Sequence, residues 1–169
     1  RSEKMNGLIT RFALPRLALA RLDEHGVDSE AVLVEAGLSA DLIREERILL
    51  TTDQLFAFWH AVGEVSGDPL IGLKLGREER VERLDVVSLA ALSAPTFREA
   101  ITRMARYKQL TCPEEIRVET SGEESSVQFV FPLAGDVESR VLIDLCFSWI
   151  TALARRGSAG TIRAKRVEF

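Results

Sequence analysis

The stretch from Val137 to Arg156 carries a helical pattern in which the polar positions form a single narrow line. Those polar residues recur every three or four positions: Arg140, Asp144, Ser148, Thr151 and Arg155. Most of the remaining positions are apolar. A surface helix has one apolar stripe, whereas a helix that is apolar around most of its circumference must be covered from several sides. The sequence therefore predicts a long buried helix, with Arg140 and Asp144 paired on its exposed line.

Short alternating segments on either side of this helix predict strands. Residues 115–119 alternate strictly, and the returning segment after the turn at 120–125 places Val127, Phe129 and Phe131 on one side. Residues 162–169 predict a third strand whose alternation slips near Lys165, as at a bulge. The pattern at about residues 113–169 is thus a β-β-α-β unit, in which a small antiparallel sheet packs on the long buried helix.

The chain from about residue 8 to residue 112 is predicted to hold six to seven helices. Its clearest start signals are two capping boxes, Thr51 to Gln54 and Thr96 to Glu99. The charged run at residues 77–83 is interpreted as a solvated connection. A helical section followed by a β-β-α-β unit predicts an α+β fold in a single domain spanning residues 1–169.

Size and charge exclude several classes of protein. A chain of 169 residues has enough core to fold without disulfides or metals, so Cys112 and Cys146 are interpreted as reduced core residues of a cytoplasmic protein. The net charge of −4 argues against direct nucleic-acid binding by this part of the chain. The longest apolar run is too short to span a bilayer and contains Asp144, so no membrane partner is expected.

The sequence contains no recognisable catalytic or metal-binding constellation. The two histidines, His25 and His60, have no cysteine or carboxylate partners at metal-ligand spacing. No nucleophile elbow, phosphate-binding glycine loop or zinc-protease motif occurs. We therefore expect neither an enzyme, nor a resident cofactor, nor a bound metal.

A binding function remains, and six side chains are candidates for contact with a ligand: Trp59, Tyr107, Phe129, Phe131, Arg140 and Trp149. Aromatic rings with a few polar groups are typical of ligand pockets. The same residues also have a structural interpretation, in which the aromatic rings fill the core and Arg140 pairs with Asp144. Both interpretations stay open at this stage.

Several sequence motifs occur in a characteristic order. Gly26-Val-Asp28 and Glu35-Ala-Gly-Leu38 are followed by Ser66-Gly-Asp-Pro-Leu-Ile-Gly-Leu-Lys-Leu-Gly76. Ser93-Ala-Pro-Thr-Phe-Arg-Glu-Ala100 and Arg106-Tyr107 come next, and Arg166-Val-Glu-Phe169 closes the chain. This order resembles the N-terminal effector domain of AraC-type transcription regulators, in the arabinose-binding-domain-like or ornithine-regulator-like branch. The resemblance covers about residues 14–169.

The resemblance implies a cytoplasmic regulator in which this domain senses a small-molecule effector and forms a homodimer. Promoter DNA would be bound through a C-terminal helix-turn-helix domain that these 169 residues do not contain. We expect a ligand cavity between the central helix, the sheet and the helical section. The alternative is a dimerisation or protein-interaction module without a ligand, which would have a solid core and an exposed apolar patch on residues 96–110.

Overall fold

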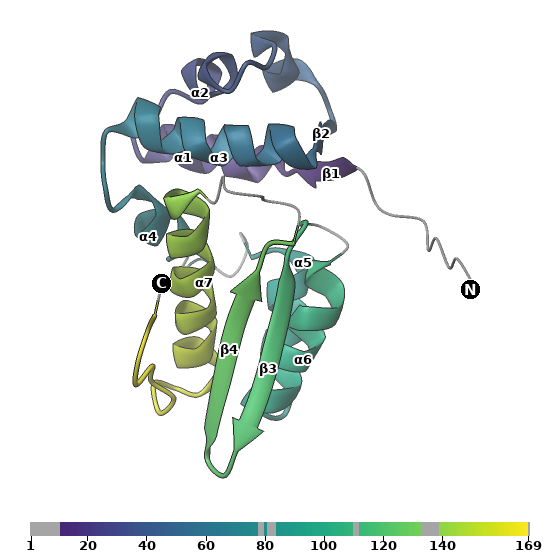
Figure 1. The fold of residues 1–169 in the computed structure, drawn as a ribbon, viewed down its shortest axis with the longest axis vertical. Helices are drawn as coiled ribbons and strands as arrows, with labels where there is room; N and C mark the ends of the chain where they lie inside the picture. The colour runs from purple at the N-terminus through teal and green to yellow at the C-terminus, as the bar shows by residue number, and fades with distance from the viewer. Residues whose placement is uncertain (1–10, 78–79, 81–83, 110–111, 133–138, 169) are drawn as a thin grey trace, which may run out of the picture.

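The long helix predicted from the sequence is the element against which much of the molecule packs (Figure 1). The computed structural model describes residues 11–77, 80, 84–109, 112–132 and 139–168. The helix, α7, spans Arg140–Gly157, and every residue from Val141 to Ala154 is buried or partly buried. The predicted start at residues 137 and 138 lies outside the described residues. No helix in the described ranges has the length and apolar character needed to cross a membrane.

The N-terminal part of the chain forms a helical layer around α3. Its elements are β1 (Arg11–Leu14), α1 (Arg16–Glu24), α2 (Ser29–Glu35), the short 3-10 helix η1 (Ala40–Arg44), β2 (Ile48–Thr51) and α3 (Thr52–Ser66). The capping box at the start of α3 is confirmed, because the side chains of Thr51 and Gln54 each accept a hydrogen bond from the other residue's main-chain N–H. Gly67 ends α3 in the left-handed conformation, at φ +58°.

The strands β1 and β2 were not predicted from the sequence. They pair antiparallel, with Phe12 opposite Leu50 and Leu14 opposite Ile48, and all four side chains are buried. Each strand has only four residues, and 33 residues separate Leu14 from Ile48. A period of two cannot be distinguished from chance over so short a run, so only the folded chain brings the two strands together.

Helix α4 (Ile71–Gly76) packs closely on α7, and its two glycines make this approach possible. A Cβ atom added to Gly72 would lie 2.4 Å from the carbonyl oxygen of Val141, and one added to Gly76 would lie 2.5 Å from that of Leu145. The Gly-x-x-x-Gly spacing therefore places two residues without side chains on the face of α4 that meets α7.

This contact corrects the prediction that the polar line of the long helix is exposed. Asp144 and Ser148 are buried, with 4% and 8% of their surface accessible, because α4 covers them. The Ser148 hydroxyl donates a 2.7 Å hydrogen bond to the main-chain carbonyl of Leu73. Arg140 does pair with Asp144, at 3.0 Å, but only the arginine is exposed. The polar residues Asp144 and Ser148 thus form part of the surface of α7 on which α4 packs.

The second half of the chain forms a helical hairpin and a β-hairpin. Helices α5 (Val86–Leu92) and α6 (Phe97–Lys108) precede β3 (Glu115–Ser121) and β4 (Glu124–Val130). The two strands pair antiparallel around a turn that contains Gly122 at φ +60°. The sheet packs on α7, where the rings of Phe129 and Phe147 meet edge to face at 5.5 Å. The predicted α+β class, with a small antiparallel sheet on a long buried helix, is confirmed.

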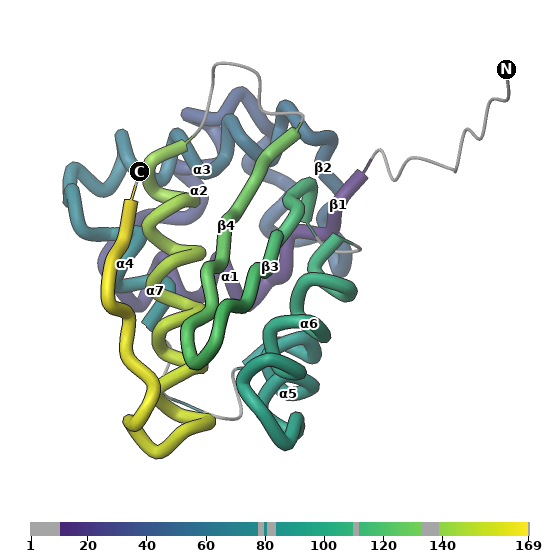
Figure 2. Tube along the Cα trace, turned by 60° about the horizontal axis from the view of Figure 1, so that its bottom comes forward, coloured from purple at the N-terminus to yellow at the C-terminus, as the bar shows by residue number. Residues whose placement is uncertain are grey.

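The predicted third strand does not form in the described residues 161–168. This segment turns after α7 and runs back alongside it (Figures 1 and 2). Residues 163–168 are all exposed, and Lys165 forms an ion pair with Glu124 through its side chain instead of pairing its backbone with β4. The slipped alternation near Lys165 leaves no continuous apolar face for a strand to bury. The β-β-α-β prediction is therefore corrected to β-β-α, and residue 169 lies outside the described part.

The charged run at 77–83 falls largely outside the described residues. Arg80, which is described, forms an ion pair with Glu24 at 2.8 Å. The prediction that the whole run at residues 77–83 is a solvated connection stays a prediction.

Candidate functional site

An apolar pocket lies between the α5–α6 hairpin and the C-terminal half of α7 (Figure 2 shows these elements). Its volume is about 230 Å³. The lining side chains come from both hairpin helices, from α7 and from the segment after α7: Ala91, Leu92, Ala94, Pro95, Thr96, Phe97, Ala100, Met104, Ile150, Leu153, Ala154, Gly157, Ser158 and Ile162. None of these lining residues belongs to the β-sheet, whereas the cavity predicted from the sequence was expected to lie against the sheet.

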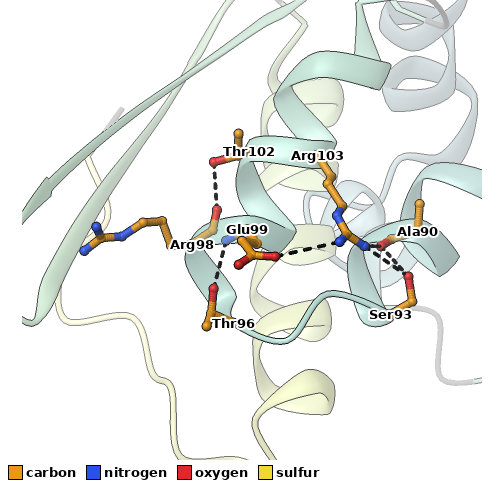
Figure 3. Close-up of polar contacts among 7 residues, drawn as sticks. All are labelled: Ala90, Ser93, Thr96, Arg98, Glu99, Thr102 and Arg103. Atoms are coloured by element: carbon orange, nitrogen blue, oxygen red, sulfur yellow. Dashed lines mark hydrogen bonds and ion pairs between the residues drawn. The ribbon is translucent and has the colours of Figure 1, made fainter.

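Polar contacts hold the hairpin wall of this pocket (Figure 3). The Arg103 guanidinium donates to the main-chain carbonyl of Ala90 and to the hydroxyl of Ser93, each at 3.3 Å, and lies 3.7 Å from the Glu99 carboxylate. These contacts join α6 to the C-terminal end of α5, where carbonyl groups lack helical partners. Thr96 caps α6 by accepting a 3.2 Å hydrogen bond from the Glu99 N–H. The separation of the two helices is therefore fixed beside the pocket.

The opposite wall ends in a turn that Ser158 organises. Its hydroxyl donates to the carbonyl of Ala154 at 2.7 Å and accepts from the N–H of Ile162 at 3.0 Å. Ala159 and Gly160 follow in the left-handed region, at φ +50° and +84°. A positive φ is uncommon for a residue with a side chain, so this turn depends on the contacts that surround it. The pocket thus lies at the point where the chain leaves α7.

A buried ion pair lies one helical turn beyond the pocket. Met104 and Ile150 line the pocket, and the residues four positions away, Lys108 on α6 and Cys146 on α7, both approach Glu114. The Lys108 ammonium is 3.6 Å from Glu114 Oε1, and the glutamate side chain has no accessible surface. Glu114 Oε1 accepts no hydrogen bond from any described residue. This carboxylate is therefore paired by charge but incompletely hydrogen-bonded.

Aromatic and polar groups complete the surroundings of Lys108. Its ammonium lies 4.7 Å from the centre of the Trp149 ring, and the indole N–H of Trp149 donates a 2.8 Å hydrogen bond to the hydroxyl of Ser88. Burial has the largest single effect and would lower the pKa of the Lys108 ammonium, but Glu114, together with smaller contributions from Cys112, Cys146 and Asp85, raises the pKa above its ordinary value. Lys108 therefore stays charged inside the protein.

The two cysteines lie beside the same carboxylate. The Cys146 thiol donates to Glu114 Oε2 at 3.4 Å. Burial, followed by the charge of Glu114, raises the pKa of Cys112 and Cys146 above the ordinary value of 9.0. A buried thiol with a raised pKa is a poor nucleophile. Among the described residues no group of three or more metal-ligating side chains comes together.

The six candidate ligand residues do not converge on one site in the structure. Trp59, Phe129 and Phe131 belong to an aromatic cluster near the first half of α7, where Phe131 meets Phe56 edge to face at 6.1 Å. Arg140 lies at the start of α7, and Tyr107 is 43% exposed on α6. Trp149 lies in the buried ion-pair region. None of the six lines the 230 Å³ pocket, and their contact with an effector stays a prediction.

A second, more open hollow lies between α2 and α3. It has a volume of about 260 Å³ and is lined by Glu35, Ala36, Ala57, His60 and Ala61. It differs from the pocket beside α7 because a carboxylate and an imidazole contribute to its wall. The two sites therefore favour different ligand chemistry.

Sequence reasoning did not identify the residues that line the pocket or form the ion pair. Small apolar residues such as Ala91, Ala100 and Ala154 carry no chemical signal of binding. Lys108 and Glu114 flank the end of a helix, where charged residues are usually solvated. Only the packing of α6, β3 and α7 shows that these two charges are buried together.

The chain is an α+β domain in which a helical section is followed by a β-hairpin that packs on a buried helix. A small apolar pocket lies beside that helix. The family model described as the arabinose-binding domain of AraC transcription regulators, N-terminal, matches residues 26–169, and the chain belongs to this family. It is thus a regulatory, ligand-sensing type of domain, from a family of transcription regulators and not of enzymes. No curated protein and no solved structure matches the chain significantly.

Proposed function

We propose that this chain senses a small-molecule effector in the pocket between the α5–α6 hairpin and α7. The observation that carries the proposal is the position of the pocket. Ser158 and Ile162, which belong to the turn where the chain leaves α7, form part of its lining. The family description names an N-terminal domain of a transcription regulator, so the segment after α7 leads in the direction of the rest of such a regulator.

The proposed mechanism is a shift between two arrangements of this turn. An effector that binds one arrangement more tightly increases its population by the ratio of the two affinities. A homodimer of cytoplasmic regulators would pass that change to a C-terminal DNA-binding domain, which contacts the promoter. The negative net charge of this chain agrees with DNA binding by a separate domain.

Thermal unfolding of the 169-residue chain in the presence of amino acids, sugars, fatty acids and aromatic compounds tests the sensing function. A ligand present at 100 times its dissociation constant stabilises the folded state by about 2.7 kcal/mol. Ala100→Leu, which fills the pocket, should abolish the stabilisation. Ala105→Leu, on a partly buried position of the same helix outside the pocket, is the matched control. A flat response across the whole set would contradict a sensing function.

The second candidate function is a dimerisation or protein-interaction module without a ligand. This candidate predicts an exposed apolar patch on residues 96–110. On α6, however, the outward-facing residues include Arg98, Thr102 and Arg106. Val86 and Leu89, three residues apart on α5, are instead 82% and 44% exposed. Sedimentation velocity of a Val86→Ser/Leu89→Ser variant tests this candidate, since a dimer that uses this surface would dissociate.

A further inference from the structure

The pocket beside α7 has a lining without charge. Each of its lining side chains is apolar except for the hydroxyls of Thr96 and Ser158. Both hydroxyls already take part in hydrogen bonds that hold the protein: Thr96 accepts from the Glu99 N–H, and Ser158 bonds to Ala154 and Ile162. The lining side chains therefore offer a ligand at most one or two additional polar partners, and any others would be main-chain groups.

We infer that this pocket takes an uncharged, mainly apolar ligand with a single polar group, and not a sugar, an amino acid or a carboxylate. A charged group placed in an apolar site without a partner loses its hydration and gains nothing in return. A sugar would leave several hydroxyls without hydrogen bonds for the same reason. The inference rests on the proposed function, because it names the chemical class of the effector for the same pocket.

The volume of the pocket limits the size of the ligand. An apolar cavity of about 150 Å³ is sufficient for benzene, so about 230 Å³ accommodates a ring with a short substituent or a branched chain of similar size. The Thr96 hydroxyl, which uses an oxygen lone pair to cap α6, keeps its proton to donate to one oxygen of the ligand. Shape and apolar contact would supply most of the binding energy.

The same ligand would contact the turn after α7. Ile162 lines the pocket, and its N–H is held by Ser158, so a ligand in the pocket stabilises the arrangement in which this hydrogen bond is formed. The left-handed Ala159 lies between these two residues in sequence. Binding of a ligand in the pocket would thus change the conformation of residues 158–162 first.

Four probes of similar size test the inference: benzyl alcohol, benzoate, benzylammonium and L-arabinose. Each is titrated into the ¹⁵N-labelled 169-residue chain, and the amide signals of Ala91, Met104 and Ile162 report on the pocket. We expect benzyl alcohol to shift these signals and to bind at least tenfold more tightly than each of the other three probes. Ala100→Leu should remove the response, whereas Ala105→Leu should keep it. Ala94→Leu, on a second lining residue, replaces Ala100→Leu if that variant loses its folded spectrum.

The outcomes separate this inference from the proposed function. If benzoate, benzylammonium or arabinose binds in the pocket as tightly as benzyl alcohol, the apolar class is overturned, while a sensing role stands. If the largest changes occur at Ala57 and His60, the hollow between α2 and α3 is the binding site and the inference is overturned. If no probe shifts the pocket signals, the inference also fails, and the thermal screen described above decides separately on sensing.

Discussion

The hydroxyl of Ser148 on α7 donates a 2.7 Å hydrogen bond to the main-chain carbonyl of Leu73 on α4. This bond forms because Gly72 and Gly76 on either side of Leu73 have no side chains to separate the helices. The carbonyls in the last turn of a helix lack partners within it, so Ser148 supplies one from α7. A motif that is visible in the sequence thus has a packing role, which couples the N-terminal layer to the central helix.

Gly76→Ala should destabilise the protein by about 1–3 kcal/mol, because the new methyl group overlaps the backbone of α7. Its Cβ would lie 2.5 Å from both the Leu145 carbonyl oxygen and the Ser148 Cβ. Alanine normally favours a helix over glycine by about 1 kcal/mol, so the expected sign is the reverse of the helix propensity. Urea unfolding measures the change.

Gly157→Ala is the matched control for this prediction. A Cβ at Gly157 would have its nearest contact at an ordinary 3.6 Å, with Leu92 Cδ2. We expect this variant to be at least as stable as the parent chain, because alanine is the better helix former. Equal stability of Gly76→Ala and Gly157→Ala would contradict the close packing of α4 on α7.

Breaking the buried ion pair should cost more than removing both charges. Lys108→Met leaves the Glu114 carboxylate uncompensated, and Glu114→Gln leaves the ammonium uncompensated, so each single change should cost about 3–5 kcal/mol. The double variant should recover much of this loss. A double-mutant cycle from urea unfolding gives the coupling between the two residues.

The exposed pair Arg44 and Asp41 provides the control for the cycle. Both side chains are more than 80% exposed, and removing either should change stability little. Additive effects of Lys108→Met and Glu114→Gln would show that the buried charges do not interact.

Stability should fall with rising pH above about 9. The pKa of the Cys112 and Cys146 thiols is raised in the folded state above the value of 9.0, so above that pH the unfolded chain loses thiol protons that the folded chain keeps. The free energy of unfolding should then decrease by up to about 1.4 kcal/mol per pH unit for each thiol. Unfolding in urea between pH 8 and 10 measures this slope, which should be smaller in Cys146→Ala.

The same thiols should resist a disulfide reagent at pH 8 while the protein is folded and react once it is unfolded in urea. Burial keeps them protonated and inaccessible. Rapid reaction of either cysteine in the folded chain would contradict the arrangement around Glu114.

Arg103→Ala should loosen the α5–α6 hairpin. The variant loses the contacts of the guanidinium with the Ala90 carbonyl and the Ser93 hydroxyl, at an expected cost of about 1 kcal/mol. Hydrogen exchange of the amides at the end of α5 should become faster. Arg98→Ala is the matched control, since the Arg98 side chain points away from this network in Figure 3. Equal effects of the two substitutions would count against a positioning role for Arg103.

Local signals in the chain were sufficient for most of the helices and for the β-hairpin. The capping box at Thr51, the left-handed Gly67 and the alternation around Ile116 each determine structure through neighbours within a few residues. The second capping box is only partly formed, because Thr96 caps the helix while the Glu99 carboxylate lies near Arg103. When a side chain has two possible partners, the tertiary fold determines which partner it contacts, and its spacing in the sequence does not.

The site was less predictable than the fold. Its lining is made of small apolar residues that any core contains, and the burial of Lys108 and Glu114 depends on α6, β3 and α7 meeting at one place. The third predicted strand failed for a related reason, since a strand needs both an alternating pattern and a neighbouring edge to which it can pair.

Periodicity, caps and turns in the chain are sufficient to predict the helices, the β-hairpin and the buried character of α7, because these signals act over short distances along the sequence. Long-range packing is needed to place α4 on one face of α7, to pair β1 with β2, to bury particular charges and to form the pocket. Those features arise from contacts between residues far apart in the sequence, and their energies depend on packing that no local pattern encodes.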